Sequence, residues 1–303
     1  MSRLVAKTPR RSFRNRRGNL ARAGMVSPAL FLVTVLIAIP LCMAVYFSLT
    51  DWKGVGLNAK FVGLKNYAQL FQDPAFARAA FVTVFIAVVT TFVLNVVGLT
   101  LASLLHHSGA LTSFYRSVFF FPMVLSPLIV GFLWRTLLDY HGVVNSFLGQ
   151  FGVGPIEFLG NPTLALWSVT GVIVWQSIGF NMVLYLAGLQ NIPKSLLEAA
   201  YVDGASAWTA FRRITMPLLA PVITINVVSV FIFNMREYDR IRSVTDGGPG
   251  GATQTLAYKV INEAFNLGLL GRGSAYAVVL MVAVALVAAV LIVFLRRREA
   301  DLT

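Results

Sequence analysis

Six long apolar stretches constrain this chain more than any other feature. Hydrophobic residues make up 57% of the sequence and charged residues only 12%, which is far from the averages of soluble domains. A helix needs about 20 apolar residues to cross the hydrocarbon core of a bilayer, where it must satisfy its own backbone hydrogen bonds. We therefore predict an all-α membrane protein with six transmembrane helices, of which the fifth is the shortest: 25–48, 79–105, 117–138, 163–189, 218–234 and 274–295.

Lys and Arg residues indicate the orientation, because they gather on the cytoplasmic side of membrane proteins. Residues 1–24 hold eight of them and no acid, so we expect a disordered, basic cytoplasmic tail. Six spans then return residues 296–303, a second basic tail, to the same side as the loop 190–217. The predicted cytoplasmic segments hold fifteen basic and four acidic residues, whereas the outer segments hold ten and eight. Residues 25–295 form the predicted six-helix domain.

Several classes of function are disfavoured. The net charge of +13 could suggest nucleic-acid binding, but the basic arm adjoins the first span, where topology and anionic lipid explain it. The sequence has three histidines (His106 and His107 at a span end and His141 in an outer loop), one cysteine (Cys42, in the first span) and no Gly-Lys dipeptide of a nucleotide-binding loop. No cluster of reactive groups is visible. We therefore predict no nucleic-acid partner, no catalytic residues, no metal site and no bound cofactor.

A charged loop, residues 190–217, interrupts the apolar pattern between the fourth and fifth spans. Pro193 suits the first turn of a helix, and Ser195 with Glu198 fits a capping box. Gly204 can end that helix before Ser206 starts another. We predict an elbow of two short helices, which could dock into a groove on another protein.

The spacing in this elbow resembles the coupling loop of membrane subunits of binding-protein-dependent ABC importers. Their pattern is Glu-Ala-Ala-x3-Gly-x9-Ile-x-Leu-Pro, and only Met216 departs from it. In the alternative interpretation, Glu198 caps a surface helix and Trp208 with Phe211 lies on the membrane face. The resemblance implies that the following residues couple the chain to an ATPase: Glu198, Ala199, Ala200, Asp203, Gly204, Ala205, Ser206, Trp208, Ile214 and Pro217.

Outer segments are similar to those of carbohydrate importer permeases of the maltose and glycerol-phosphate type. The motifs are Gly63-x2-Asn66-Tyr67 before Asp73-Pro74, Pro127-x3-Gly131-x2-Trp134, Gly142-x2-Asn145, and the glycine-rich turn Thr245-x-Gly247-Gly248-Pro249. The resemblance implies the type I (MetI-like) ABC importer permease fold in a prokaryotic inner or plasma membrane. It also implies a second homologous permease, two ATP-binding subunits that carry ATP and Mg, and an extracytoplasmic solute-binding protein.

Uncharged polar side chains inside the spans form a second candidate site. Such amides either hydrogen-bond between helices, at about 0.6–2 kcal/mol each, or line a hydrated cavity for a hydroxyl-rich solute. Ser177 and Asn181 lie four residues apart on one helix face, and the resemblance to maltose-type permeases favours the second role for these two and for Asn234. The candidate substrate path comprises Ser177, Phe180, Asn181, Ser229, Asn234 and, with a weaker match to the family, Glu237.

Two prolines, Pro122 and Pro127, predict kinks in the third span, which serve either packing or a transport cavity. Two other classes of function remain open at this point: a stand-alone secondary transporter of a polar solute, and a membrane-embedded enzyme. Neither explains the elbow. The carbohydrate itself is not specified by the sequence.

Overall fold

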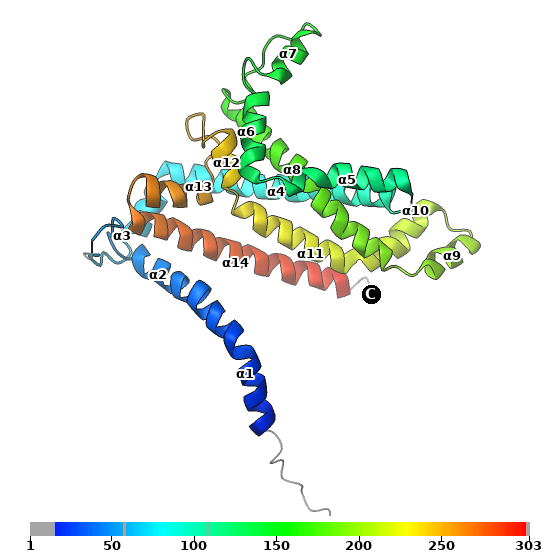
Figure 1. The fold of residues 1–303 in the computed structure, drawn as a ribbon, viewed down its shortest axis with the longest axis horizontal. Coiled ribbons are helices and arrows are strands. Elements are labelled where there is room, and N and C mark those ends of the chain that lie inside the picture. The colour runs from blue at the N-terminus through cyan, green and yellow to red at the C-terminus, as the bar shows by residue number, and fades with distance from the viewer. Residues whose placement is uncertain (1–15, 57–58, 108, 301–303) are drawn as a thin grey trace, which may run out of the picture.

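The computed structural model describes residues 16–56, 59–107 and 109–300, and their regular structure is helical apart from an isolated antiparallel bridge between Thr50 and Phe61. The predicted all-α fold is therefore confirmed (Figure 1). The elements are α1 (Arg16–Val33), η1 (Thr34–Ala38), α2 (Ile39–Ser48), α3 (Lys65–Gln72), α4 (Pro74–Leu105), α5 (Ala110–Val124), α6 (Pro127–Leu137), α7 (Val143–Gly149), α8 (Pro162–Gln190), α9 (Lys194–Val202), α10 (Ala207–Ala210), η2 (Phe211–Thr215), α11 (Met216–Met235), α12 (Asp239–Val244), α13 (Leu256–Ile261), η3 (Asn262–Asn266) and α14 (Leu270–Ala300).

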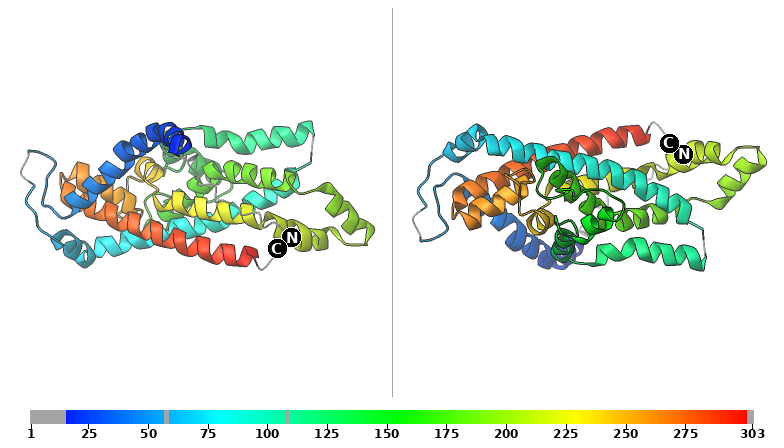
Figure 2. Two further views of the ribbon diagram at one scale, coloured as in Figure 1. Left: turned by 90° about the horizontal axis from the view of Figure 1, so that it is seen from below. Right: turned by 90° about the horizontal axis from the view of Figure 1, so that it is seen from above.

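Five helices in the described part of the chain are long and apolar enough to cross a membrane, and the bent pair α5–α6 makes a sixth candidate. The long helices α4, α8, α11 and α14 pack beside one another in one bundle, and α11 runs opposite to the other three (Figures 1 and 2). The elbow and the end of α14 lie at one end of this bundle, and α3 and α13 lie at the other (Figure 1). This arrangement agrees with the predicted placement of the elbow and the C-terminal segment on one side.

The third span differs from the prediction of one kinked helix over 117–138. Two helices, α5 and α6, meet at an angle of 98°, and Leu125 and Ser126 between them have extended backbone conformations. Pro127 is the cause, because its ring disfavours helical geometry at the preceding residue and it has no N–H to donate. Only α5 runs along the bundle, beside α8.

The fifth span is longer than predicted. A helical segment extends over Ala207–Met235, whereas hydropathy placed its start at residue 218. Arg212 and Arg213 lower the mean hydropathy of the turns before that residue. In the structure the π-helical turn η2 precedes Pro217, which then occupies the first turn of α11, where a missing N–H is tolerated.

The first span begins earlier than predicted. Helix α1 starts at Arg16, so residues 16–24 are helical rather than disordered, and residues 1–15 lie outside the described residues. Helix α1 projects away from the bundle, whereas α2 packs against α14 (Figure 1). The apolar side chains along η1, such as Leu36 and Ile37, are exposed, as expected for a helix surrounded by lipid or by another membrane protein.

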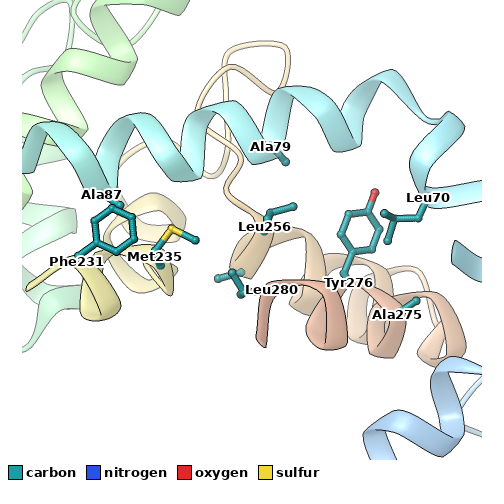
Figure 3. Close-up of a cluster of buried hydrophobic side chains, with 10 residues drawn as sticks. Leu70, Ala79, Ala87, Phe231, Met235, Leu256, Ala275, Tyr276 and Leu280 are labelled. Atoms are coloured by element: carbon teal, nitrogen blue, oxygen red, sulfur yellow. The ribbon is translucent and has the colours of Figure 1, made fainter. Parts of the chain in front are cut away.

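A buried apolar cluster joins the spans to the connection between α11 and α14. Phe231 and Met235 of α11 lie near Ala87 of α4, and Tyr276 of α14 lies near Leu70 of α3 (Figure 3). Close packing makes such clusters rigid. The outer connection is thereby held against α4, which positions the residues that follow α11.

Candidate functional site

The elbow has the predicted shape but different details. Helix α9 ends at Val202, and Gly204 has a φ of +80°, a conformation that glycine adopts without steric cost. The amides of Gly204 and Ala205 donate to the carbonyls of Tyr201 and Ala200 at 3.1 and 2.9 Å, as in a Schellman C-cap. The Ser206 hydroxyl then accepts from the Thr209 amide at 3.2 Å and begins α10.

Two details of the predicted elbow are wrong. Pro193 is the N-cap of α9, so Ser195 lies inside the helix and the capping box with Glu198 does not form. The second helix is not a separate element, because α10 and η2 are the first turns of the fifth span. The elbow is therefore joined directly to α11.

The elbow exposes the side chains that a docking surface requires. None of the residues of α9 is buried, and apolar side chains are exposed, with Val202 at 87% and Trp208 at 68%. Trp208 and Phe211 stack with ring centroids 5.8 Å apart. No hydrogen bond or ion pair of Glu198 occurs among the described residues, and Glu198 lines a groove of about 640 Å³ together with His106 and His107.

The ten predicted coupling residues fall into two groups. Eight lie on the elbow itself, from Glu198 to Trp208. The other two, Ile214 and Pro217, are partly buried where η2 joins α11. These two residues belong to the joint rather than to the exposed surface.

All six predicted substrate-path residues line one cavity of about 550 Å³, here called the α8–α11 cavity. It lies between α8, α11 and the break between α5 and α6. Its lining comprises Leu94, Met123, Leu125, Pro127, Gln176, Ser177, Phe180, Asn181, Ser229, Val230, Phe233, Asn234, Arg236, Glu237, Tyr238, Asp239 and Arg240. Amides, hydroxyls and aromatic rings thus converge on one space, as in sites for small polar ligands.

The break in the third span contributes directly to this cavity, which favours the transport interpretation of the prolines. Leu125 and Pro127 are part of the lining. The side-chain amide of Gln176 on α8 donates to the Leu125 carbonyl at 2.9 Å. This bond compensates a carbonyl group that the interrupted helix leaves without its usual partner.

An ion pair lies at the junction of α11 and α12, beside the cavity. Arg240 donates from Nε to Oε1 of Glu237 at 2.8 Å and from Nη2 to Oε2 at 2.5 Å. Its Nη1 donates to the Ser177 hydroxyl on α8 at 3.1 Å. The side chains are only 5% and 13% exposed for Glu237 and Arg240. The predicted path residues Glu237 and Ser177 are therefore bridged by one guanidinium group.

Sequence reasoning did not assign Arg240 or Gln176 to the path. The spacing of Glu237 and Arg240, three residues apart, was a usable signal for an ion pair. Gln176 was visible as a polar residue inside a span, but its partner Leu125 is 51 residues away in the chain. Only the fold brings these two residues together.

The amides inside the spans divide between the two roles left open by the sequence. Asn181 and Asn234 line the cavity. Asn95 on α4 instead accepts a hydrogen bond of 2.5 Å from Tyr185 on α8. Asn226 is fully buried away from the cavity. Asn95 therefore serves helix packing, and neither Asn95 nor Asn226 lines the cavity.

An apolar bundle of spanning helices around a polar cavity, with an exposed elbow at one end, defines a multi-pass membrane transport protein. The chain belongs to the family of binding-protein-dependent transport system inner membrane components, whose model matches residues 94–299. This range contains the elbow and the complete lining of the α8–α11 cavity. The predicted identity as a permease subunit of an ABC importer is confirmed, and the alternative of a stand-alone transporter is not supported.

Relatives of known name belong to several transport systems. The probable starch degradation products transport system permease protein AmyD of Thermoanaerobacterium thermosulfurigenes is 30% identical over 280 residues, 91% of this chain and 94% of that protein. The trehalose/maltose transport system permease protein MalF of Thermococcus litoralis is 34% identical, with 86% and 88% covered. The sn-glycerol-3-phosphate transport system permease protein UgpA of Agrobacterium fabrum is 34% identical, with 90% and 94% covered.

Solved structures show the same fold. A chain of a bacterial ABC transporter involved in the import of the acidic polysaccharide alginate superposes with a TM-score of 0.79 at 20% identity, covering 96% of this chain and 99% of that chain. The same type of transporter in complex with an alginate pentasaccharide-bound periplasmic protein gives a TM-score of 0.78 at 21% identity, with 97% and 98% covered. The predicted importer permease fold is thus confirmed.

Proposed function

We propose that this chain forms part of the path by which an ATP-driven importer moves a sugar or sugar-like solute across a prokaryotic inner or plasma membrane. The names of the starch-product and trehalose/maltose relatives support a sugar. The α8–α11 cavity supplies amides, hydroxyls and aromatic rings, which suit a solute rich in hydroxyl groups. Ser177, Asn181 and Asn234 contact the solute in this proposal, and Phe180, Ser229 and Glu237 complete the wall.

ATP is hydrolysed elsewhere in the proposed assembly. Two cytoplasmic subunits bind ATP and Mg, a second homologous permease completes the path, and an extracytoplasmic binding protein delivers the solute. The observation that carries this proposal is the elbow, because α9 buries no side chain and exposes apolar groups. A solvent-exposed apolar patch on a short helix is typical of a docking surface.

The elbow can transmit movement because it continues into a spanning helix. The segment Ala207–Met235 runs from beside Trp208 to the cavity residue Asn234, a length of roughly 40 Å at 1.5 Å per residue. Movement of the elbow would therefore move the wall of the cavity. An exchange between outward-open and inward-open packings from 1:99 to 99:1 requires about 5.5 kcal/mol of differential binding, which closure of the ATP-binding subunits would supply.

The charge of Glu198 provides the test. Glu198→Lys reverses an exposed, unpaired charge on α9, and we expect it to reduce co-purification of the ATP-binding subunits and to abolish uptake while the protein still inserts in the membrane. Glu157→Lys, at an exposed position in the connection between α7 and α8, is the matched control and should retain both. Normal amounts of ATP-binding subunits on the Glu198→Lys protein, with normal solute-stimulated ATP hydrolysis, would refute the proposed coupling.

A further inference from the structure

The charges around the α8–α11 cavity are balanced within the protein. Its lining contains two arginines, Arg236 and Arg240, and two acids, Glu237 and Asp239, so its formal charge is zero. A site for an anion normally presents an arginine whose donors are free for the ligand. The availability of these two guanidinium groups therefore decides which solutes the cavity can accept.

Three of the five N–H donors of the Arg240 guanidinium, one on each nitrogen, are already used within the protein. Both carboxylate oxygens of Glu237 accept from it, and its remaining terminal nitrogen donates to Ser177. The Arg240 backbone amide also donates to Oε1 of Glu237 at 3.2 Å. An anion that approached Arg240 would have to displace a carboxylate that is only 5% exposed, and the displaced carboxylate would then be buried without a partner.

The pair is also held in place by its backbone. The Thr255 hydroxyl donates to the Glu237 carbonyl at 2.7 Å, and the Thr83 hydroxyl on α4 accepts from the Leu256 amide at 2.8 Å. Both bonds are buried. The backbone of Glu237 is thus tied to α4 through the start of α13, and this fixes the point from which its side chain reaches Arg240.

The second arginine, Arg236, lies in a more exposed environment than Arg240. The Arg236 side chain is exposed, and its guanidinium carbon lies 5.9 Å from the ring centroid of Phe233. Asp239, which is also exposed, lies in the same wall. An anion near Arg236 would therefore meet a carboxylate as well, and its attraction would be screened by solvent.

We propose that the Glu237–Arg240 pair makes the α8–α11 cavity selective for uncharged saccharides over carboxylated or phosphorylated ones. The proposal rests on the proposed function of this cavity as the solute path. Family membership does not decide the matter, because one relative is named for trehalose and maltose and another, at the same 34% identity, for sn-glycerol-3-phosphate. Glu237 acts here as a specificity determinant that neutralises Arg240.

Protection of a single cysteine reports which solutes enter the cavity. In the assembled importer, Cys42→Ser removes the native thiol and Ser229→Cys places a thiol in the cavity wall. Maleimide labelling is followed with maltose and trehalose as uncharged solutes, and with sn-glycerol-3-phosphate and glucuronate as anions. We expect the uncharged sugars to slow labelling and the anions to leave it unchanged.

Freeing the arginine should reverse the rejection of anions. In Glu237→Gln the guanidinium keeps its charge and loses its counter-charge, so anions should now protect the thiol at concentrations at least roughly tenfold below any at which they protect the wild-type protein. Glu237→Gln combined with Arg240→Gln carries neither charge and should again reject anions. Asp246→Asn breaks the Arg242–Asp246 pair outside the cavity and should leave the selectivity as in the wild type.

The outcomes separate this inference from the proposed function. Equal protection of the wild-type protein by anions and uncharged sugars would overturn the charge selectivity while supporting the cavity as the path. Unchanged anion rejection in a correctly assembled Glu237→Gln importer would also overturn it. If no solute protects the thiol while the importer still transports, the cavity is not the path, and both proposals fail. If Glu237→Gln does not assemble, protection of the wild-type protein by anions still overturns the charge selectivity, and its absence supports it.

Discussion

The backbone amide of Ala205 donates a hydrogen bond of 2.9 Å to the carbonyl of Ala200, and this bond closes the end of α9. It forms because Gly204, between them, adopts a φ of +80°. A Cβ atom at Gly204 would meet no other atom within 4 Å. The glycine is therefore required for its backbone conformation and not for space, and the angle of the elbow depends on this one residue.

Replacement of Gly204 should change coupling without disturbing the bundle. Gly204→Val forces a β-branched residue into the left-handed region, which costs about 1–2 kcal/mol, so α9 should end differently. We expect fewer ATP-binding subunits on the purified permease, and lost uptake at normal membrane insertion. Gly204→Asn is the control, because asparagine tolerates this conformation, and it should retain most activity. A Gly204→Val permease that binds its ATP-binding subunits normally would contradict this account.

At a second position, Gly179, glycine is required because there is no room for a Cβ atom. A Cβ atom at Gly179 of α8 would lie 2.2 Å from the carbonyl oxygen of Phe119 on α5, so the two backbones are in direct contact. Gly179→Ala must push α5 away, and overpacking of this kind costs about 1–3 kcal/mol. Gly171→Ala on the same helix meets no atom within 4 Å and should be neutral or slightly stabilising. The two variants are compared by the apparent melting temperature of the purified importer. Equal temperatures for Gly179→Ala and Gly171→Ala would refute the close contact.

The Tyr185–Asn95 hydrogen bond should contribute to packing rather than to transport. Tyr185→Phe removes the donor to Asn95, and we expect a loss of about 1 kcal/mol in stability, within the range measured for hydrogen bonds between membrane helices. Tyr46→Phe, at an exposed hydroxyl on α2, should have no effect. A double-mutant cycle with Asn95→Leu measures the coupling energy, and a value of zero would show that the bond does not stabilise the bundle.

Hydropathy located the spans because apolar residues run along each span, both where it packs against other helices and where it faces the lipid. It failed where the backbone geometry depends on single residues. The prolines predicted a bend in the third span, but not its angle of 98° or the Gln176 side chain on α8 that donates to the Leu125 carbonyl at the break. The start of the fifth span was misplaced because Arg212 and Arg213 are exposed on a helix that hydropathy alone could not follow.

The candidate sites show the same division. The elbow was predictable because its helix ends are encoded locally, by Gly204 and by Ser206. The six candidate path residues could be placed near one another in advance, because polar groups inside an apolar span are costly and therefore informative and the resemblance to maltose-type permeases pointed to the same two spans. Arg240 was not found, because its role depends on Ser177, which is 63 residues away. Contacts between distant segments determine which polar residues share a cavity, and no local pattern contains that information.

Two asparagines on α11 allow the solute path to be distinguished from helix packing. Asn234 lines the α8–α11 cavity, whereas Asn226 is fully buried elsewhere and both of its side-chain polar atoms lack a hydrogen-bond partner. Asn234→Leu should therefore lower uptake, because it removes an amide from the path while the external binding protein keeps its affinity for the solute. Asn226→Leu removes an unsatisfied amide from an apolar environment and should leave uptake unchanged, with equal or higher stability.

Uptake by the assembled importer, measured over a range of sugar concentrations and normalised to the amount of permease in the membrane, compares the two variants directly. The two substitutions are chemically identical and lie on the same helix, so a general effect of leucine on insertion would appear in both. In the proposed path Asn234 contacts the solute inside the membrane, so its loss should reduce the transport rate without changing binding to the external protein. Unchanged uptake in Asn234→Leu, or an equal loss in both variants, would remove Asn234 from the solute path.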